Sequence, residues 1–527
     1  MSKELEYLSH HVSLGRMSRR DFLGRAAALG VATPFVNSLP SSVAMAEEPV
    51  RGGIIKAAIQ GGQTTNSLDP AAISSQIPFN FSKVWGEYLV ALEPGGLERR
   101  LAEEFGSSAD AKVWTFKIRN GVEFHNGKTV TAEDVVATLE RHSNEQSRSG
   151  ALGITRGIES IKAQGRDVVV TLKEGNSDLP YLMADYHFII QPNGGKDDPA
   201  AGISAGPYKV AVNQPGTRHV GERFKNFWQP DKMGFADQVE IIVVNDPTAQ
   251  TSALQGGQVH MINRVEPKIV DLLKHVPGVE IKPVSGPGHV GFIMQCDTAP
   301  FDNFDLRMAL KLAINREEMA DKIQRGYGSV GNDFPINASY PLFTEIEQRP
   351  YDPDKAKFHY NKSGHDGTVL LRTANVAFPG AVDAAQLYQQ SAAKAGIKLE
   401  IKREPGDGYW SEVYLKQPFC ATYWSGRPTQ DQIYSTFYQS SAQWNETHFF
   451  NEKFDKLLTE ARAEFDQDKR KNLYHQMALI VRDQSGFIIP MFIPNIDAIS
   501  DKVGGFGPGI NFELMDGYAL DKCWLKA

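Results

Sequence analysis

The stretch GVEFHNGKTVTAEDV, residues 121–135, carries the most specific structural signal in this sequence. Its residues 131–134, TAED, have the form of a helix capping box, in which threonine and an acidic residue satisfy free backbone N–H groups. An apolar helix is therefore expected to follow. The first half imitates a phosphate-binding P-loop, but five residues separate Gly121 from Gly127 where that loop has four. The segment is predicted to be a structural turn that opens a helix.

Two further enzyme-like motifs also fail on their context. Residues 202–206, GISAG, fit the G-x-S-x-G pattern, but a nucleophile elbow needs a strand before it and a helix after it, and Pro207 follows here. Residues 286–291, GPGHVG, fit a dinucleotide fingerprint, yet a strand-like segment follows where a helix is required. No H-E-x-x-H zinc motif is present. We therefore expect a protein that is not an enzyme and carries no cofactor or metal.

The length and composition describe a large globular protein. A chain of 527 residues is expected to form two to four domains. Its 41% hydrophobic and 23% charged residues are typical of soluble proteins. No apolar run approaches the roughly 20 residues needed to span a bilayer.

The N-terminus is predicted to be an export signal. Residues 18–23, SRRDFL, match the twin-arginine pattern, the apolar run 26–36 follows, and the small-residue site 44–46 lies downstream. We expect cleavage after Ala46, localisation in the periplasm and the twin-arginine export machinery as a partner. The removed part holds five basic and three acidic residues, so the formal charge changes from −7 to −9. An acidic protein is a poor partner for nucleic acid, because neutralising phosphates requires a basic face.

Three widely spaced cysteines, Cys296, Cys420 and Cys523, form no metal-binding spacing and allow at most one disulfide. Free thiols are the favoured interpretation.

Strand-like and helical segments alternate, above all after residue 360, which predicts an α/β fold. Strands are expected at 54–59, 113–118, 168–172, 188–191, 239–244, 290–296, 369–373, 398–402, 419–425 and 488–493. Helices are expected at 305–314, 316–325, 381–395, 452–464 and 468–483.

The sequence resembles the large periplasmic solute-binding proteins of ABC importers for dipeptides, oligopeptides, nickel chelates and opines, known as extracellular solute-binding protein family 5. The stretches that carry the resemblance are 51–53 (RGG), 68–70 (LDP), 101–103 (LAE), 114–119 (WTFKIR), 121–135, 205–208 (AGPY), 301–302 (FD) and 306–310 (LRMAL).

The resemblance implies a periplasmic-binding-protein-like α/β fold with two lobes, a hinge and three domains. Domain I would comprise 47–83, 203–292 and 495–527, domain II 84–202, and domain III 293–494. Chain crossings near Thr298 and Pro494 would form the hinge, whose closure would bury a solute. The implied partners are a small solute and the ABC permease subunits of the inner membrane, with the binding protein itself a monomer.

The strongest candidate for ligand contact is TYWSGRPTQD, residues 422–431. The expected strand 419–425 places Trp424, Gly426 and Arg427 at its C-terminal end, where α/β sheets bind ligands. In dipeptide-binding relatives an aspartate follows the equivalent tryptophan and glycine and pairs with the ligand's ammonium group. Arg427 stands at that position, and its charge favours a carboxylate or phosphate. An exposed arginine without a ligand is the alternative.

Seven further residues are weaker candidates, because they lie in loops expected on the same side of the strands. They are Asn66, Ser67, Phe378, Tyr409, Trp410, Trp444 and Asn445.

The leading hypothesis is a receptor that delivers a peptide-like or opine-like solute, anionic in character, to an ABC permease. A nickel-chelate or oligosaccharide receptor is the alternative within the same family. A secreted hydrolase acting through Ser204 and a chaperone-like role are the alternatives from other classes.

Overall fold

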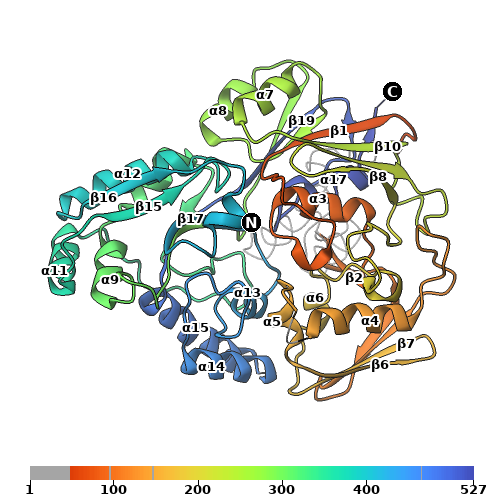
Figure 1. The fold of residues 1–527 in the computed structure, drawn as a ribbon, viewed down its shortest axis with the longest axis horizontal. Helices are drawn as coiled ribbons and strands as arrows, with labels where there is room; N and C mark the ends of the chain where they lie inside the picture. Colours follow the sequence, from red (N-terminus) through yellow and green to blue (C-terminus); the bar gives the residue numbers. More distant parts are fainter. Residues whose placement is uncertain (1–47, 94–95, 145–146, 465, 527) are drawn as a thin grey trace, which may run out of the picture. The chain divides into compact units, whose positions relative to one another are not determined.

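Three β-sheets organise the chain, and each has its own helices (Figure 1). The computed structural model describes residues 48–93, 96–144, 147–464 and 466–526. Residues 50–527 form one unit. The predicted twin-arginine signal and the cleavage site after Ala46 lie outside the described residues.

The first sheet combines strands from distant parts of the sequence, in the order β12-β19-β11-β1-β10-β9-β8. The strands are β1 (Ile54–Ile59), β8 (Tyr208–Gln214), β9 (Arg218–Arg223), β10 (Gln238–Val243), β11 (Met261–Ile262), β12 (Val279–Val284) and β19 (Asn495–Ser500). On β1, Ile55 and Ala57 pack in the same cluster as residues of α3 (Gln76–Trp85). The intervening Ala58 packs with α7 (Pro247–Gln255) and α8 (Pro267–Leu273). Because alternate residues face opposite sides of a strand, β1 is buried on both faces.

The second sheet is antiparallel, in the order β4-β5-β7-β6. Its strands are β4 (Ala102–Ser107), β5 (Val113–Ile118), β6 (Ile158–Gln164) and β7 (Asp167–Leu172). Helix α4 (Ala132–Ser143) packs on β6 and β7. Its predicted capping box is confirmed, since Asp134 N donates to Thr131 Oγ1 at 3.3 Å and Thr131 N donates to Asp134 Oδ2 at 3.0 Å. The P-loop-like stretch before α4 is a turn closed by a bridge between Glu123 and Thr129.

The third sheet has the order β14-β18-β13-β17-β15-β16. Its strands are β13 (His289–Met294), β14 (Ser329–Val330), β15 (Val369–Thr373), β16 (Leu399–Arg403), β17 (Phe419–Trp424) and β18 (Phe487–Phe492). The helices of this part are α9 (Phe304–Leu312), α10 (Arg316–Met319), α11 (Pro353–Ser363), α12 (Ala381–Lys394), α13 (Gln430–Phe437), α14 (Glu452–Ala463) and α15 (Gln467–Gln484).

The α/β prediction is confirmed, and most expected elements are present within two residues of their predicted ends. The strand expected at 188–191 is wrong. This buried segment joins no sheet; Ile190 N donates to Glu87 O at 2.9 Å, and Pro192 begins the short turn η3 (Pro192–Gly195). The helix expected at 316–325 is divided into α10 and the π-helical turn η4 (Ala320–Gln324). Helices α3, α7, α8, α11 and α13 were not predicted.

The chain passes between the first and third sheets at two places. One crossing is 285–288, between β12 and β13, and the other is 493–494, between β18 and β19. The two segments touch, since Ile493 N donates to Gly288 O at 2.9 Å. The crossing expected at Pro494 is confirmed. The one expected near Thr298 is wrong, because β13 already belongs to the third sheet from His289, before the predicted start of domain III.

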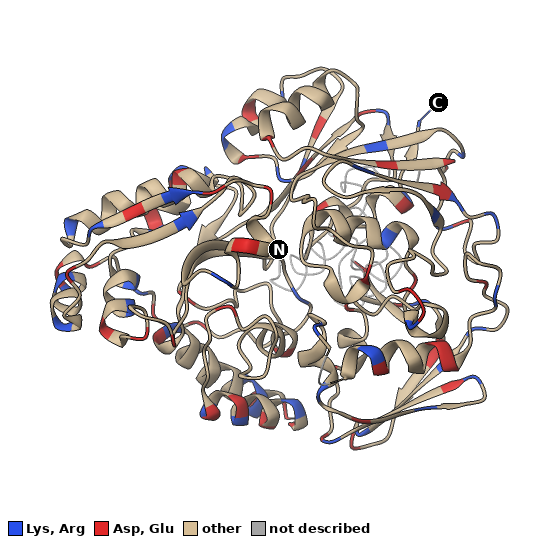
Figure 2. Cartoon of the chain, in the orientation of Figure 1, with Lys and Arg blue, Asp and Glu red and all other residues tan. Residues whose placement is uncertain are grey.

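Charged residues of both signs are mixed along the described helices and strands (Figure 2). Exposed ion pairs of this kind contribute little to stability, typically 0 to about 1 kcal/mol each. Buried charges matter more, because each must be compensated inside the protein.

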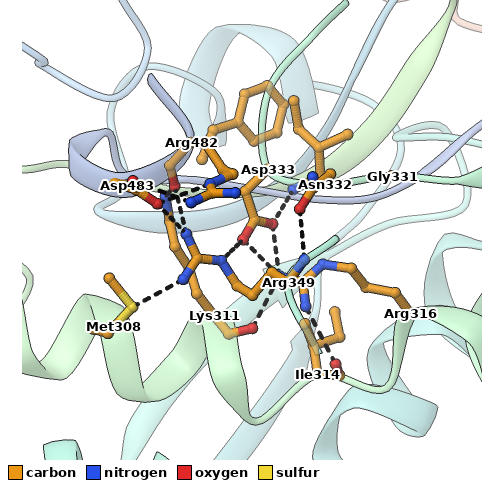
Figure 3. Close-up of polar contacts among 12 residues, drawn as sticks. Met308, Lys311, Ile314, Arg316, Gly331, Asn332, Asp333, Arg349, Arg482 and Asp483 are labelled. Carbon is orange, nitrogen blue, oxygen red and sulfur yellow. Dashed lines mark hydrogen bonds and ion pairs between the residues drawn. The ribbon is translucent and has the colours of Figure 1, made fainter. Parts of the chain in front are cut away.

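One such buried group, here called the Asp333 cluster, comprises Asp333, Arg316 and Arg349 (Figure 3). The buried Asp333 carboxylate accepts hydrogen bonds from Arg316 Nη2 at 2.7 and 2.6 Å. Arg349 Nε lies 2.9 Å from the same carboxylate, and its Nη2 donates to Asp483 at 2.7 Å. Both arginines therefore have acidic partners. The cluster ties α10 to the loop 331–349 and, through Asp483, to the end of α15.

The three cysteines are free thiols; Cys420 and Cys523 are buried and Cys296 is half-buried. No helix in the described residues is long and apolar enough to cross a membrane.

Candidate functional site

Two adjoining cavities lie beside the end of β17. The space between atoms amounts to about 490 Å³ in the first chamber and about 430 Å³ in the second, and both values include space that is open to solvent. Phe79, Tyr186, Arg427 and Phe512 line both. The first chamber is also lined by Ser74, Ser75, Gln76, Trp410, Tyr414, Tyr423, Trp424, Ser425 and Trp444. The second is also lined by Lys83, Leu92, Tyr181, Ala184, Asp185, Pro428, Gln432, Asn511, Asp516 and Tyr518.

Segments far apart in the sequence supply these walls. Residues 424–428 connect β17 to α13. Helix α3 begins at Gln76 and carries Phe79 and Lys83 on its buried surface. Tyr186 follows the short helix α6 (Leu179–Leu182), and the segment 511–518 lies near the C-terminus. Elements that belong to different sheets therefore meet at the chambers, as a closing cleft requires.

Arg427 is 4% exposed, and its guanidinium has few partners. Its Nη1 donates to the carbonyl oxygens of Gly426 at 3.0 Å and Ser425 at 3.4 Å, while Nε has no hydrogen-bond partner. Among the described residues, no carboxylate forms an ion pair with it. Aromatic rings surround it instead, with centroids 5.2 to 5.7 Å from Cζ, namely Phe512, Phe437 and Tyr186. A buried cation with an unused donor is suited to receive an anion.

The nearby acid Asp185 is already occupied. Its Oδ1 accepts from His187 Nδ1 at 2.6 Å, and its Oδ2 accepts from Gln432 Nε2 at 3.3 Å. His187 Nε2 faces the carbonyl oxygen of Ile73 at 3.1 Å. Both ring nitrogens of His187 thus face oxygen atoms of neighbouring segments, which fixes the orientation of the ring. Burial opposes ionisation of Asp185, but His187 and then Arg427 outweigh it and lower its pKa to about 2. Asp185 is therefore ionised near pH 7 and already has partners within the chain.

Trp424 is held from behind by the buried Glu446. The indole Nε1 donates to Glu446 Oε1 at 2.6 Å, and Thr422 Oγ1 donates to Oε2 at 3.3 Å. Burial raises the pKa of Glu446 to about 8, only partly opposed by hydrogen bonds from Trp424, Tyr414 and Thr422. The carboxyl group is therefore neutral near pH 7, and it fixes Trp424 without adding negative charge to the chamber.

In the second chamber, Lys83 and Asp516 have separate partners. Burial lowers the pKa of Lys83 to about 8, and its Nζ lies 4.1 Å from the ring centroid of Tyr88. Asp516 Oδ1 accepts from the backbone of Asn511 at 2.8 Å and Phe512 at 2.7 Å. Burial nevertheless raises the Asp516 pKa to about 6. These contacts shape the segment 510–516 that carries Phe512 into both chambers.

Four of the ten predicted ligand residues line the first chamber, namely Trp410, Trp424, Arg427 and Trp444. They come from the turn η5 (Tyr409–Val413), from β17 and the loop after it, and from the loop after α13. The structure brings them together, and their contact with a ligand stays a prediction.

The other six candidates line neither chamber. Phe378 packs in the core of the third sheet, and Tyr409 OH donates to Ala421 O at 2.8 Å. Asn445 Nδ2 donates to Phe449 O at 2.8 Å. These contacts assign the three residues to packing and loop closure.

Contacts within the protein also involve the remaining three candidates, Asn66, Ser67 and Gly426. Asn66 Nδ2 donates to Ser75 Oγ at 3.1 Å, and Ser67 Oγ accepts from Asp69 N at 3.0 Å. A Cβ on Gly426 would lie 2.2 Å from Pro287 Cγ, so the space beside this glycine is needed by the protein itself. The close approach expected for a ligand is made there by Pro287.

Sequence reasoning missed Phe79, Tyr186, Phe512 and Glu446. Phe79 was detectable in principle, since 76–85 has an amphipathic pattern. The other three lie in irregular segments, and no local pattern marks them.

The enzyme-like motifs have structural roles. Ser204 is fully buried, and its Oγ donates to Ile190 O at 2.6 Å and accepts from Glu87 N at 3.0 Å. The glycine-rich stretch at 286–291 runs into strand β13. Over the part of the chain that the structure describes, no group of three His, Cys, Asp or Glu side chains could hold a metal ion.

An α/β protein in which separate sheets meet around chambers with aromatic walls, with a buried guanidinium that has no carboxylate partner among the described residues, has the construction of a receptor for a small solute. Residues 96–446 match the family of bacterial extracellular solute-binding proteins, family 5. The chain belongs to this family, whose members are substrate-binding proteins of ABC importers rather than enzymes.

Individual relatives support the same assignment. Di/tripeptide-binding protein 1 of Pseudomonas aeruginosa (strain UCBPP-PA14) is 26% identical over 463 residues, which cover 79% of this chain and 85% of that protein. The periplasmic binding protein AgaA of A. tumefacien R10, solved with agropinic acid, aligns with a TM-score of 0.83 at 22% identity. That alignment covers 90% of this chain and 99% of AgaA. DppA of Helicobacter pylori, solved with the peptide STSA, aligns with a TM-score of 0.82 at 20% identity, over 91% and 99% of the two chains. At these identities the solved structures show a shared fold.

Proposed function

We propose that this protein captures an anionic solute in the two chambers beside β17 and delivers it to the permease of an ABC importer. The observation that carries the proposal is Arg427, a buried guanidinium that faces both chambers, has a free Nε donor and pairs with no carboxylate. A bound carboxylate or phosphate would supply the missing partner.

The same observation separates the candidate solutes. Relatives include a di/tripeptide-binding protein and a receptor solved with agropinic acid. The ammonium group of an ordinary peptide needs an acid, and Asp185, which lines the second chamber with Arg427, is already bonded to His187 and Gln432. The position of Arg427 therefore favours a solute that presents an acidic group, such as an opine-like conjugate or a peptide bound through its carboxylate. Nickel-chelate and oligosaccharide receptors are the alternatives.

Calorimetry with Arg427→Ala tests the proposal. The solute is first identified by thermal shift against peptides, opines, amino-acid conjugates and nickel chelates, since saturating ligand stabilises the native state measurably. Arg427→Ala is expected to cost on the order of 2 to 5 kcal/mol of binding, because a desolvated anion loses its partner. Arg427→Asp should weaken binding further. An Arg427→Ala affinity within twofold of wild type contradicts the proposal.

Arg307→Ala is a matched control. Arg307 is also buried, but it donates to the carbonyl oxygens of Phe301 at 2.7 Å and Asp302 at 3.2 Å and lines neither chamber. Its removal should lower stability and leave solute affinity unchanged.

Export is part of the proposal: we infer twin-arginine translocation to the periplasm and cleavage after Ala46, supported by the pattern of residues 18–23. Replacing Arg19 and Arg20 by lysine should leave the precursor in the cytoplasm. Normal processing of that variant would contradict the inference.

Hinge closure is the remaining element, and the paired crossings at 285–288 and 493–494 support it. Small-angle scattering should give a smaller radius of gyration when the solute is bound. An unchanged radius at saturation would argue against closure, provided that the empty protein is shown to be open.

A further inference from the structure

The first chamber has an unusually aromatic lining. Eight of its thirteen lining residues are phenylalanine, tyrosine or tryptophan. Such rings interact with flat unsaturated groups by offset stacking and edge-to-face contact, beyond the effect of buried area alone. Aromatic walls also suit two other ligand classes, organic cations and sugars. The charges and the free polar atoms of the lining distinguish between these classes.

The rings are arranged as a box and not as a single platform. Trp410 meets Tyr423 at 79° with centroids 5.2 Å apart, and meets Tyr414 at 70° and 5.4 Å. Trp424 lies at 65° to Tyr414 and at 44° to Trp444. A flat group in this chamber would meet ring faces on one side and ring edges on another.

The charges of the first chamber exclude an organic cation. Arg427 is the one charged side chain among its described lining residues. No carboxylate lines the chamber, and the Glu446 carboxyl group behind Trp424 is neutral, because burial raises its pKa to about 8. A cationic ligand would therefore be repelled by Arg427 without an acid to compensate.

The polar atoms of the lining are few for a sugar. Ser75 Oγ already accepts from Asn66, and Gln76 Nε2 donates to the hydroxyl of Tyr423 at 3.3 Å. Gln76 Oε1 accepts from Asn80 at 3.2 Å. Trp410 Nε1, a buried donor without a hydrogen-bond partner, and the side chains of Ser74 and Ser425 remain. These groups can pair with only part of a polyhydroxylated ligand, and each buried hydroxyl group left unpaired is costly.

We propose that the solute is an aromatic monocarboxylate, with a flat unsaturated ring system in the first chamber and its carboxylate on Arg427. This inference rests on the proposed function and narrows it from an anionic solute to one chemical class. One carboxylate is expected in the first chamber, because Arg427 is the one charged side chain among its described lining residues.

A matched set of probes tests the inference by calorimetry on the purified chain, after any co-purified solute has been removed by reversible unfolding. Indole-3-acetate, phenylacetate and 2-naphthoate present a flat ring and a carboxylate. Cyclohexylacetate keeps the carboxylate without a flat ring, and tryptamine keeps the ring with a positive charge. At least one aromatic acid should bind tenfold or more tightly than cyclohexylacetate, and tryptamine should bind at least a hundredfold more weakly than that acid.

Two variants assign the selectivity to the proposed residues. Arg427→Gln should remove the preference for the aromatic acid over tryptamine, and Trp410→Leu should reduce the preference over cyclohexylacetate while acid binding remains. Trp444→Phe gives a second reading of the ring preference if the Trp410 variant fails to fold.

The outcomes separate this inference from the proposed function. Equal binding of cyclohexylacetate, or no binding of any aromatic acid at millimolar concentration, overturns the aromatic class. If another anion then binds in an Arg427-dependent manner, the proposed function stands without the inference. Tryptamine that binds as tightly as the aromatic acids contradicts both.

Discussion

The Asp333 cluster and the first chamber both contain buried arginines, but the two regions treat them in opposite ways. Arg316 and Arg349 share the carboxylate of Asp333 at 2.6 to 2.9 Å, and Arg349 also pairs with Asp483. Arg427 is equally buried, yet it meets backbone carbonyls and aromatic rings, and its Nε is free. The charges of the first region are compensated within the chain, whereas Arg427 has no carboxylate partner among the described residues.

Burial of a charge therefore does not by itself indicate function. A buried ion pair whose partners both come from the chain contributes to structure, and removing one partner is strongly destabilising. A buried cation without a partner instead raises the free energy of the empty protein, and a ligand that pairs with it recovers part of that cost. The partners of a buried arginine indicate a binding site only together with its position, since Arg307 also has a free Nε and only carbonyl partners but lines neither chamber.

The largest effect is expected from breaking the complete region. Asp333→Asn leaves Arg316 and Arg349 without their shared carboxylate and should lower the free energy of unfolding by about 3 to 5 kcal/mol. Urea unfolding measures this directly. The control Asp483→Asn changes the partner of Arg349 that is 40% exposed and should cost less than about 1 kcal/mol. Equal losses in the two variants would refute the distinction.

A smaller loss is expected behind the aromatic wall. Trp424→Phe keeps a ring in place but removes the Nε1–H donor to Glu446. The buried carboxyl oxygen then lacks this partner, so the free energy of unfolding should fall by about 1 to 3 kcal/mol. In Glu446→Leu, which has no carboxyl group to satisfy, the same tryptophan change should cost less. A double-mutant cycle without coupling would show that the hydrogen bond is unimportant.

The affinity for an anionic solute is expected to depend on pH through the buried Glu446. Burial raises the pKa of Glu446 to about 8, so the native protein keeps this proton between its ordinary value near 4.3 and pH 8. The contribution of this proton to the free energy of unfolding is complete below the ordinary pKa of a glutamate and is lost as the pH rises towards 8. Above pH 8 the new negative charge should weaken binding of an anionic solute by up to about tenfold per pH unit.

Glu446→Gln stays neutral and serves as the control for this pH dependence. Lys83, whose pKa burial lowers to about 8, titrates in both proteins, so the difference between their affinity profiles isolates Glu446. Parallel profiles from pH 7 to 9 would exclude a role of this carboxyl group.

The smallest effect is expected where the charge is unpaired. Arg427→Met should leave the free energy of unfolding unchanged or raise it by up to about 1 kcal/mol, because no acid loses a partner. The matched Arg316→Met should be strongly destabilising, since it removes the Nη2 donor that contacts both carboxylate oxygens of Asp333. Thermal and urea unfolding of both variants provide the measurement. A loss above about 2 kcal/mol for Arg427→Met would mean that Arg427 has a structural role.

Features that depend on neighbouring residues could be predicted from the sequence alone. The capping box at residues 131–134 fixes the start of α4, because its hydrogen bonds span only three positions. Periodic apolar patterns located most strands and the long helices, and hence the α/β fold. The strand predicted at 419–425 is β17, which ends one residue earlier than predicted, at Trp424.

Which of these residues line the same cavity, and which buried charges form ion pairs, depends on the tertiary structure. Tyr186 and Phe512 reach the chambers from irregular segments separated from Arg427 by tens or hundreds of residues in the chain, and Glu446 holds Trp424 from behind, so no local pattern identifies these three residues. Gly426 leaves room for Pro287 from a crossing segment, a contact that spacing cannot reveal. Whether a buried arginine has an acidic partner likewise depends on packing between distant elements. Local hydrogen bonds and periodic patterns depend on residues that are close together in the sequence, whereas charge compensation depends on contacts that form only in the folded protein.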